Sequence, residues 1–146
     1  MKKLFLFLSI FLASLSFNSC TNDDDDDNIP NPSSDQVLGK WQMDQLFSNN
    51  VEQTLNVCDK THTVEFFSSG AVTDKNFEEN DASQCVALPV VNGTWKNMGN
   101  SMYRFTNMAI SDVKCTFQTN KMTFEFSRIV NGVTSTEKGI FIKVTS

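Results

Sequence analysis

The feature that most constrains this chain is a strict alternation of apolar and polar residues in its second half. Apolar residues occupy every second position from Val113 to Phe117 and again from Met122 to Phe126, with Asn120-Lys121 between the two segments as a turn. Side chains of a β-strand point alternately to its two faces, so each segment has one apolar face. Two such segments joined by a short turn predict an antiparallel β-hairpin.

The same pattern recurs elsewhere in the chain. Thr63–Phe66 and Ala71–Asp74 are alternating segments with a turn at Ser68-Ser69-Gly70 between them. Asn131-Gly132 is a strong two-residue turn signal, because both of its positions favour positive φ. Apolar residues alternate again in the last segment, where Gly139 predicts a bulge or a bend: Ile140, Ile142 and Val144.

These segments amount to about eight strands, and no helical periodicity of useful length interrupts them. The strands are expected to start near Gly39, Thr63, Ala71, Gly93, Met102, Ser111, Lys121 and Val133. Short strands at regular spacing, joined by hairpins, are typical of barrels and sandwiches. Closure into a barrel removes exposed strand edges. We therefore expect an all-β domain that forms a small eight-stranded antiparallel up-and-down barrel.

The first twenty residues have the layout of a secretory signal. Lys2 and Lys3 precede a short apolar stretch, and small residues follow up to Ser19-Cys20. The stretch is shorter than the roughly 20 residues of a membrane-spanning helix. Phe17–Cys20 resembles the lipobox of bacterial lipoproteins, in which the Cys thiol receives a diacylglyceryl group. The alternative is an ordinary signal peptide with an incidental Cys.

A run of five aspartates, Asp23–Asp27, follows Cys20, and Asn28–Ser34 continues it as an extended linker. The run is a solvated spacer in one interpretation and resembles surface-export signals of some Gram-negative lipoproteins in another. We expect a signal peptide over residues 1–19, lipidated Cys20 with a disordered acidic linker over 20–36, and the barrel domain over 37–146. The expected location is the Gram-negative outer membrane, with lipid as the only membrane contact and a palmitate chain as its anchor.

Three motifs along the barrel segment carry a family resemblance. Gly39-Lys40-Trp41 is similar to the Gly-x-Trp opening of lipocalins, and Thr63–Phe66 with Gly70 and then Gly93-Thr94-Trp95 follow in the order found in compact lipocalin-like lipoproteins. The resemblance covers about residues 37–145. It implies that Trp41 closes one end of the barrel and that the lumen binds a small hydrophobic molecule. Typical lipocalins add a helix after the barrel, which we do not expect after Ser146.

Many lipocalins also place an arginine against the motif tryptophan. The candidates are Arg104 and Arg128. Arg128 has the same parity as Phe124 and Phe126, so a cation–π contact with Trp41 is one interpretation. A solvent-facing Arg128 at the end of its strand is the other.

The cysteines other than Cys20 divide by position. Cys58 and Cys85 lie outside the strand cores and in an oxidising compartment, so they are the natural disulfide pair, and the resembling lipoproteins often carry a Cys at both places. Cys115 lies on an apolar face, which predicts a buried, reduced thiol. A reactive Cys115 or a swapped pairing remains the alternative.

Charge and side-chain chemistry narrow the function. The formal charge is −5, and the run Asp23–Asp27 supplies five of the 17 acidic residues, so acidity belongs to the tail. No basic stripe is present to bind nucleic acid. His62 is the only histidine. A Ser–His or Cys–His nucleophile would have to use it, and no nearby residue indicates such a site. A zinc site needs several His or Cys ligands, which the chain does not supply. We expect no catalytic residue, no metal and no cofactor.

Two functions remain. In the first, the lumen binds a small hydrophobic ligand, because an eight-stranded barrel can hold one. Its lining would be the inward-facing aromatic residues: Trp41, Phe66, Phe105, Phe117, Phe124 and Phe126. In the second, these rings fill a solid barrel, and the outer loops contact a protein or a glycan, as an interaction module or an inhibitor.

Overall fold

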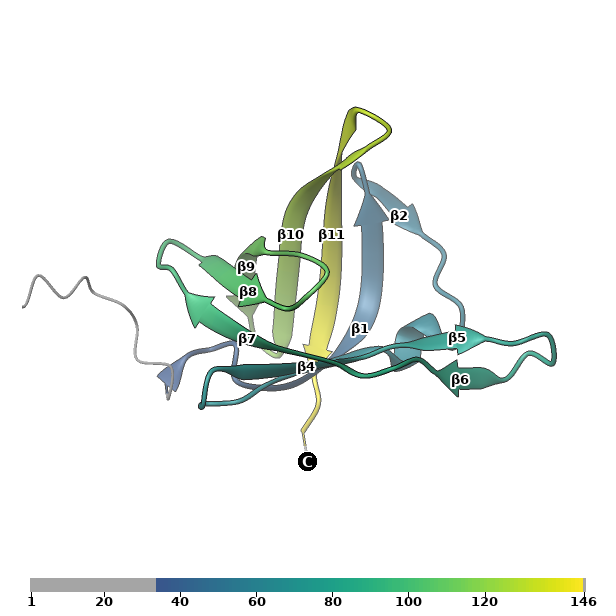
Figure 1. Ribbon diagram of the computed structural model, residues 1–146, viewed down its shortest axis with the longest axis horizontal. Coiled ribbons are helices and arrows are strands. Elements are labelled where there is room, and N and C mark those ends of the chain that lie inside the picture. Colours follow the sequence, from purple (N-terminus) through teal and green to yellow (C-terminus); the bar gives the residue numbers. More distant parts are fainter. Residues whose placement is uncertain (1–33, 146) are drawn as a thin grey trace, which may run out of the picture.

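Antiparallel strands close into a barrel in the computed structural model, which describes residues 34–145 (Figure 1). The barrel strands are β1 (Gly39–Ser48), β3 (Thr63–Phe66), β4 (Ala71–Lys75), β7 (Val91–Asn97), β8 (Met102–Thr106), β9 (Asp112–Gln118), β10 (Lys121–Val130) and β11 (Val133–Lys143). Each pairs with the next in this order, and β11 returns to pair with β1. The predicted eight-stranded up-and-down barrel is confirmed, and the strands begin within two residues of the predicted starts.

Three further strands and one short helix lie in the longer connections. β2 (Val51–Gln53) adds to the edge of β1, while β5 (Phe77–Glu79) and β6 (Cys85–Ala87) form a hairpin of their own. The 3₁₀-helix η2 (Asp59–Thr61) leads into β3. The sequence did not predict these strands because each has only three residues and is largely exposed, so it shows no alternation.

The turn and bulge predictions had different outcomes. Asn131 and Gly132 both have positive φ, at 51° and 78°, as the hairpin signal predicts. The bulge expected at Gly139 is instead in β1, where the register against β11 shifts between Met43 and Gln45. Gly139 itself keeps an unbroken register with β10. A Cβ there would lie 2.9 Å from the Phe141 ring, so Gly139 is required for space.

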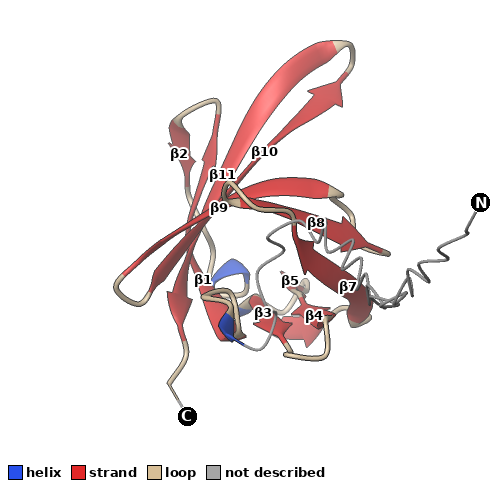
Figure 2. Ribbon diagram, turned by 90° about the vertical axis from the view of Figure 1, so that its left-hand side faces the viewer, coloured by secondary structure: helices blue, strands red, loops and turns tan. Residues whose placement is uncertain are grey.

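The two ends of the barrel differ in their connections. At the closed end, residues 67–70, 98–101 and 119–120 form tight turns. At the open end, residues 49–62, 76–90 and 107–111 form longer connections, and the β10–β11 hairpin extends beyond the other strands (Figure 2). Long connections at one end leave that end of the lumen less tightly covered by backbone.

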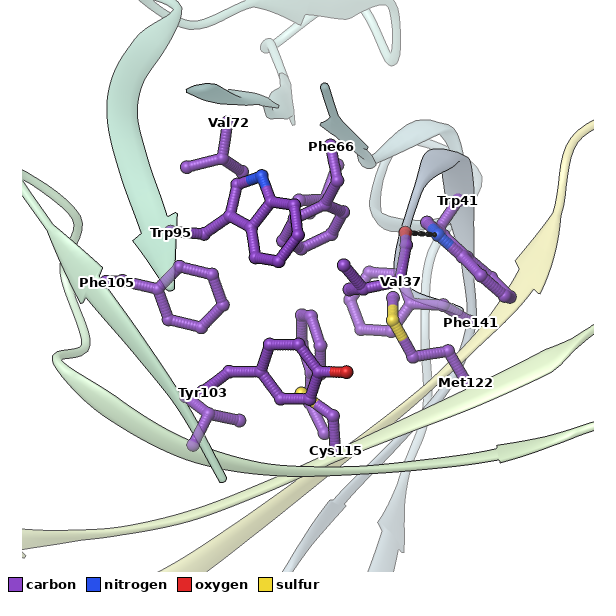
Figure 3. Packing of buried hydrophobic residues seen from close by; sticks show 13 residues of the cluster. Val37, Trp41, Phe66, Val72, Trp95, Tyr103, Phe105, Cys115, Met122 and Phe141 are labelled. Carbon is purple, nitrogen blue, oxygen red and sulfur yellow. Dashed lines mark hydrogen bonds between the residues drawn. The ribbon is translucent and has the colours of Figure 1, made fainter. Parts of the chain in front are cut away.

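The closed end is packed by apolar side chains and by the chain entering β1. Thirteen buried residues form one cluster, and Figure 3 shows their rings and sulfur atoms converging in the lumen. Val37, one of the thirteen, is fully buried, and its carbonyl accepts a hydrogen bond of 2.6 Å from Trp41 Nε1. Trp41 therefore lies at one end of the barrel, as the lipocalin resemblance implies.

Asp35 fastens the entering chain to this end. Its carboxylate accepts hydrogen bonds of 2.6 Å from the Tyr103 hydroxyl and from Asn97 Nδ2, and one of 3.0 Å from the backbone N–H of Val37. Buried polar groups need such partners to offset their lost hydration. The sequence assigned Asp35 to the linker, whereas the structure places it in contact with the barrel.

The N-terminal predictions lie outside the described residues: the signal peptide, Cys20 and the aspartate run. Within residues 34–145, no helix is long and apolar enough to cross a membrane. In the same part of the chain, no group of three or more His, Cys, Asp or Glu side chains is placed to hold a metal ion.

Candidate functional site

An apolar pocket of about 230 Å³ lies inside the open end of the barrel. Its walls come from six barrel strands and from the β8–β9 loop. The apolar lining is dominated by aromatic and thioether side chains: Met43, Phe66, Phe105, Met108, Phe124, Phe126 and Phe141. A concave, mostly apolar cavity with few polar groups is the usual form of a small-molecule site.

The bulge in β1 and the glycine in β11 shape one wall of this pocket. The register shift after Met43 changes which residues of β1 face inward, so Met43 and Leu46 both line the pocket. Gly139 pairs with Leu46 and leaves space for the ring of Phe141. These local irregularities therefore set the width of the pocket on its β1–β11 side.

The core cluster closes the pocket on the side that faces the closed end of the barrel. The ring of Phe124 lies 5.2 Å from that of Phe141 and 6.1 Å from those of Phe66 and Phe105, measured between centroids. Phe124 is only 6% exposed, so it serves both the core and the pocket. Phe126, two residues further along β10, is less buried: it lines the pocket and packs against the edge of the core cluster.

One polar pair interrupts the apolar wall. His62 Nε2 and Asp74 Oδ1 are 2.8 Å apart, and the two side chains are 16% and 21% exposed. The same Asp74 oxygen accepts a second hydrogen bond of 3.2 Å from Asn76 Nδ2. The His62 ring also packs edge-on against Phe141, with centroids 5.6 Å apart. The pair is therefore held in place by its neighbours on the pocket wall.

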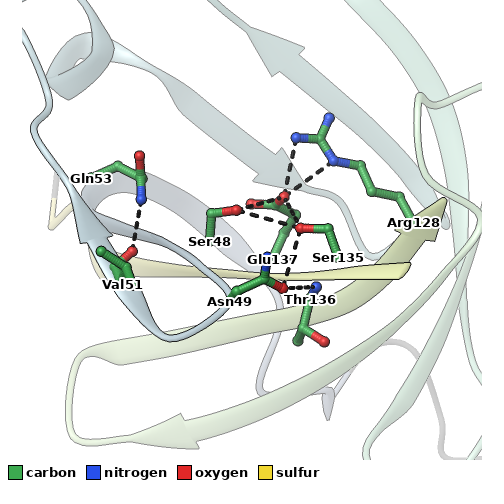
Figure 4. A network of polar contacts seen from close by, with 8 residues as sticks. All are labelled: Ser48, Asn49, Val51, Gln53, Arg128, Ser135, Thr136 and Glu137. Atoms are coloured by element: carbon green, nitrogen blue, oxygen red, sulfur yellow. Dashed lines mark hydrogen bonds and ion pairs between the residues drawn. The ribbon is translucent and has the colours of Figure 1, made fainter. Parts of the chain in front are cut away.

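A second polar cluster joins the open-end parts of β1, β10 and β11 (Figure 4). Glu137 is 5% exposed, and its Oε1 receives hydrogen bonds from Ser48, Ser135 and Arg128 at 3.0–3.2 Å. Arg128 Nη2 also lies 3.1 Å from that oxygen. Three side chains therefore converge on one oxygen of the buried Glu137 carboxyl group, and Arg128 lies beside it.

The structure separates the six residues predicted to line a ligand. Phe66, Phe105, Phe124 and Phe126 line the open-end pocket. Trp41 and Phe117 do not, because they pack together at the closed end with ring centroids 6.1 Å apart. Alternation predicts which side chains face inward but not how far each lies along the barrel axis.

Several lining residues were missed by the sequence reasoning. Phe141 lies between Ile140 and Ile142, so this part of β11 is apolar on both faces. The sequence pattern therefore does not identify which face points into the barrel. Met108 lies in a loop, where no periodicity exists. The contact between His62 and Asp74 had one signal in the sequence: His62 directly precedes β3, and Asp74 in β4 pairs with Val64, so the two residues are diagonal neighbours across the predicted hairpin.

The proposed contact between Arg128 and Trp41 is wrong. Arg128 does share the inner face of β10 with Phe124 and Phe126, as predicted. It lies at the open end, however, and pairs with Glu137, whereas Trp41 lies at the closed end. The cation over the Trp41 ring is instead Lys143, whose Nζ is 5.1 Å from the ring centroid. A cation–π contact thus exists, with a lysine from β11.

The cysteines also have defined positions. Cys58 and Cys85 form a disulfide with Cα atoms 5.2 Å apart. It joins the β1–β3 connection to the β5–β6 hairpin, both at the open end. Cys115 is fully buried and unpaired in the core cluster. Burial raises the pKa of the Cys115 thiol, since a thiolate would lose its hydration there.

A larger hollow of about 500 Å³ lies at the closed end, and the core residues Tyr103 and Cys115 form part of its lining. It is a shallow, mostly polar depression that includes Ser34, where the described part of the chain begins. The open-end pocket is smaller but more enclosed and lined mainly by apolar side chains. It is therefore the better candidate for a ligand site.

Comparison with known proteins agrees with this geometry. No curated protein matches the sequence. A family model described as a lipocalin-like domain matches residues 37–126, which is more than half of the chain. The match covers the strands from β1 to most of β10, including the two glycine–tryptophan motifs. The chain therefore belongs to the lipocalin-like domain family.

Proposed function

We propose that this protein binds a small hydrophobic molecule in the open-end pocket. The observation that carries the proposal is the apolar cavity of about 230 Å³ inside a barrel whose other end holds a cluster of buried apolar side chains. Lipocalin-like domains are typically binding proteins without catalytic activity, which supports a role in binding.

The volume limits the size of the ligand. An enclosed apolar cavity of about 150 Å³ accommodates benzene. By proportion, 230 Å³ accommodates roughly nine non-hydrogen atoms. The pocket therefore fits a single ring with a short substituent, and a larger molecule would extend through the open end.

Binding of n-propylbenzene to the folded domain tests the proposal. Ala109 lines the pocket from the β8–β9 loop, so Ala109→Trp should obstruct the cavity and weaken binding by at least about tenfold. Met98→Trp is the matched control, because it adds the same indole at an exposed turn of the closed end. Titration calorimetry should show saturable binding to wild type and to Met98→Trp. Absence of binding to wild type, or equal binding to all three proteins, would overturn the proposal.

We further propose that Cys20 is lipidated and anchors the mature protein in the outer membrane, with residues 20–36 as a spacer. The support is the order of charges, apolar residues and Ser19-Cys20 in the sequence. Labelled palmitate should enter wild type but not Cys20→Ala, and the variant should be released or remain as a precursor. Equal membrane retention of both proteins would contradict lipidation.

A second function, as an interaction module, is favoured by the projecting β10–β11 hairpin. Its side chains Ile129 and Val133 are 75% and 67% exposed. They lie on opposite faces of the hairpin, so a partner would have to contact both of its faces. This function would replace the first if no small molecule enters the pocket.

A further inference from the structure

The polar pair on the pocket wall identifies the chemical class of the ligand. We propose that the pocket takes a small apolar amine, with its ammonium group at Asp74 and its apolar body among the phenylalanine rings. The inference rests on the proposed function, because it requires that the pocket bind a molecule at all.

The first step is the hydrogen-bonding state of Asp74. The Asp74 carboxylate makes two hydrogen bonds with the described residues, one with His62 and one with Asn76, and both involve the same oxygen, Oδ1. The other oxygen, Oδ2, accepts no hydrogen bond from that part of the chain. A carboxylate can accept about four hydrogen bonds. Asp74 therefore retains acceptor capacity on a wall of the pocket.

The second step is the charge that a ligand meets. Asp74 is the one carboxylate among the described residues that line the pocket. Glu137 does not line the pocket, and Arg128, whose Nη2 is 3.1 Å from its Oε1, places a positive charge beside it. No lysine or arginine among the described residues lines the cavity, and the one lining side chain that can be cationic, His62, contacts Oδ1 and not Oδ2. A ligand carboxylate would be repelled by Asp74, whereas an ammonium would make a charge-assisted hydrogen bond with it.

The third step is the aromatic lining. Five phenylalanine rings line the pocket beside the His62–Asp74 pair: Phe66, Phe105, Phe124, Phe126 and Phe141. The face of an aromatic ring carries negative electrostatic potential and attracts cations. A carboxylate together with several aromatic rings is the combination that recognises amines, while the same rings exclude water from an apolar body.

A series of ligands of nearly equal shape separates this chemistry from simple apolar binding. In n-propylbenzene, 2-phenylethanol and 2-phenylethylamine the terminal group changes from methyl to hydroxyl to ammonium, and phenylacetate supplies the anion. Because hydrogen bonds to ionised groups are about twice as strong as neutral ones, we expect the amine to bind at least about tenfold more tightly than n-propylbenzene. The alcohol should lie between them, and phenylacetate should bind most weakly.

Asp74→Asn tests the residue assigned to the ammonium. The variant keeps the side-chain shape but removes the charge, so amine affinity should fall by about tenfold while n-propylbenzene affinity stays within about threefold. Asp112→Asn is the control: it removes an equal charge at a carboxylate that pairs with Arg104 on the surface, 2.8 Å away, outside the pocket. Amine affinity should not change in that variant.

The outcomes distinguish this inference from the proposed function. Binding of n-propylbenzene as tight as that of the amine, or tightest binding of phenylacetate, would overturn the amine assignment and leave the pocket a ligand site. An amine preference that persists in Asp74→Asn would also overturn it. If no member of the series binds wild type, both proposals fail. The comparison of ligands on wild type stands even if the variant does not fold.

Discussion

Two ionisable side chains, Cys115 and Tyr103, lie inside the core cluster at the closed end. Burial raises the pKa of the Cys115 thiol, with the nearby charge of Asp35 as a smaller cause. Burial also raises the pKa of the Tyr103 hydroxyl, which donates a hydrogen bond to Asp35. Both groups are therefore neutral in the folded protein at pH values where an unfolded chain would ionise them.

This difference predicts alkaline destabilisation. Above the ordinary Cys pKa of 9.0, the unfolded chain loses a proton that the folded protein keeps. The free energy of unfolding should then fall with rising pH by up to about 1.4 kcal/mol per pH unit for this group. Urea unfolding at pH 8, 9 and 10 should show a smaller decline for Cys115→Ala than for wild type. If the free energy of unfolding falls equally with pH in wild type and in Cys115→Ala, burial does not keep the Cys115 thiol protonated.

Phe124 and Phe126 are two residues apart on the same face of β10 but have different roles. Phe124 is 6% exposed and packs against three other rings, so Phe124→Ala should cost about 3–5 kcal/mol of stability. Phe126 lines the pocket and is only partly buried, so Phe126→Ala should cost about 1–2 kcal/mol. Chemical denaturation of the two variants measures this difference. Equal losses would indicate that the barrel is packed to its open end.

At the scale of elements, the disulfide restrains the two longest connections of the open end. It closes a loop with a sequence separation of 27 residues. The chain-entropy relation gives about 3.5 kcal/mol for a loop of this length. Cys58→Ala combined with Cys85→Ala should lower the free energy of unfolding by that amount. A reducing agent should lower the stability of wild type similarly and leave the double variant unchanged. No response of wild type to reduction would contradict the role of the bond.

The elements that the sequence predicted are those with a buried face. Apolar and polar residues alternate in β9 and β10 because the inner residues fill the lumen. The turn at Asn131-Gly132 could be predicted because a tight hairpin needs positive φ at both positions. β2, β5 and β6 bury little, so burial imposes no pattern on them. The bulge in β1 was unpredicted, since it depends on the register with β11, which lies about a hundred residues away in the chain.

At the scale of the whole molecule, the two ends of the barrel differ: one holds the cluster of buried side chains, and the other holds the enclosed apolar pocket. The strand pattern alone did not reveal this difference between the ends, because it predicts only that four aromatic side chains all point inward: Trp41, Phe66, Phe105 and Phe117. Their separation into two groups depends on the shear of the barrel, which sets where each strand position lies along the axis. The family relationship is consistent with a ligand site, and the pocket at the open end gives that site a location.

Methyl NMR with n-propylbenzene tests the central claim most directly, because methionines report on both regions. Met43 and Met108 line the pocket, whereas Met122 is fully buried in the core beyond it. If the open end binds the ligand, the methyl signals of Met43 and Met108 should shift in a saturable manner while that of Met122 changes much less. Unchanged Met43 and Met108 signals at saturating n-propylbenzene would contradict the assignment of the open-end pocket as a ligand site.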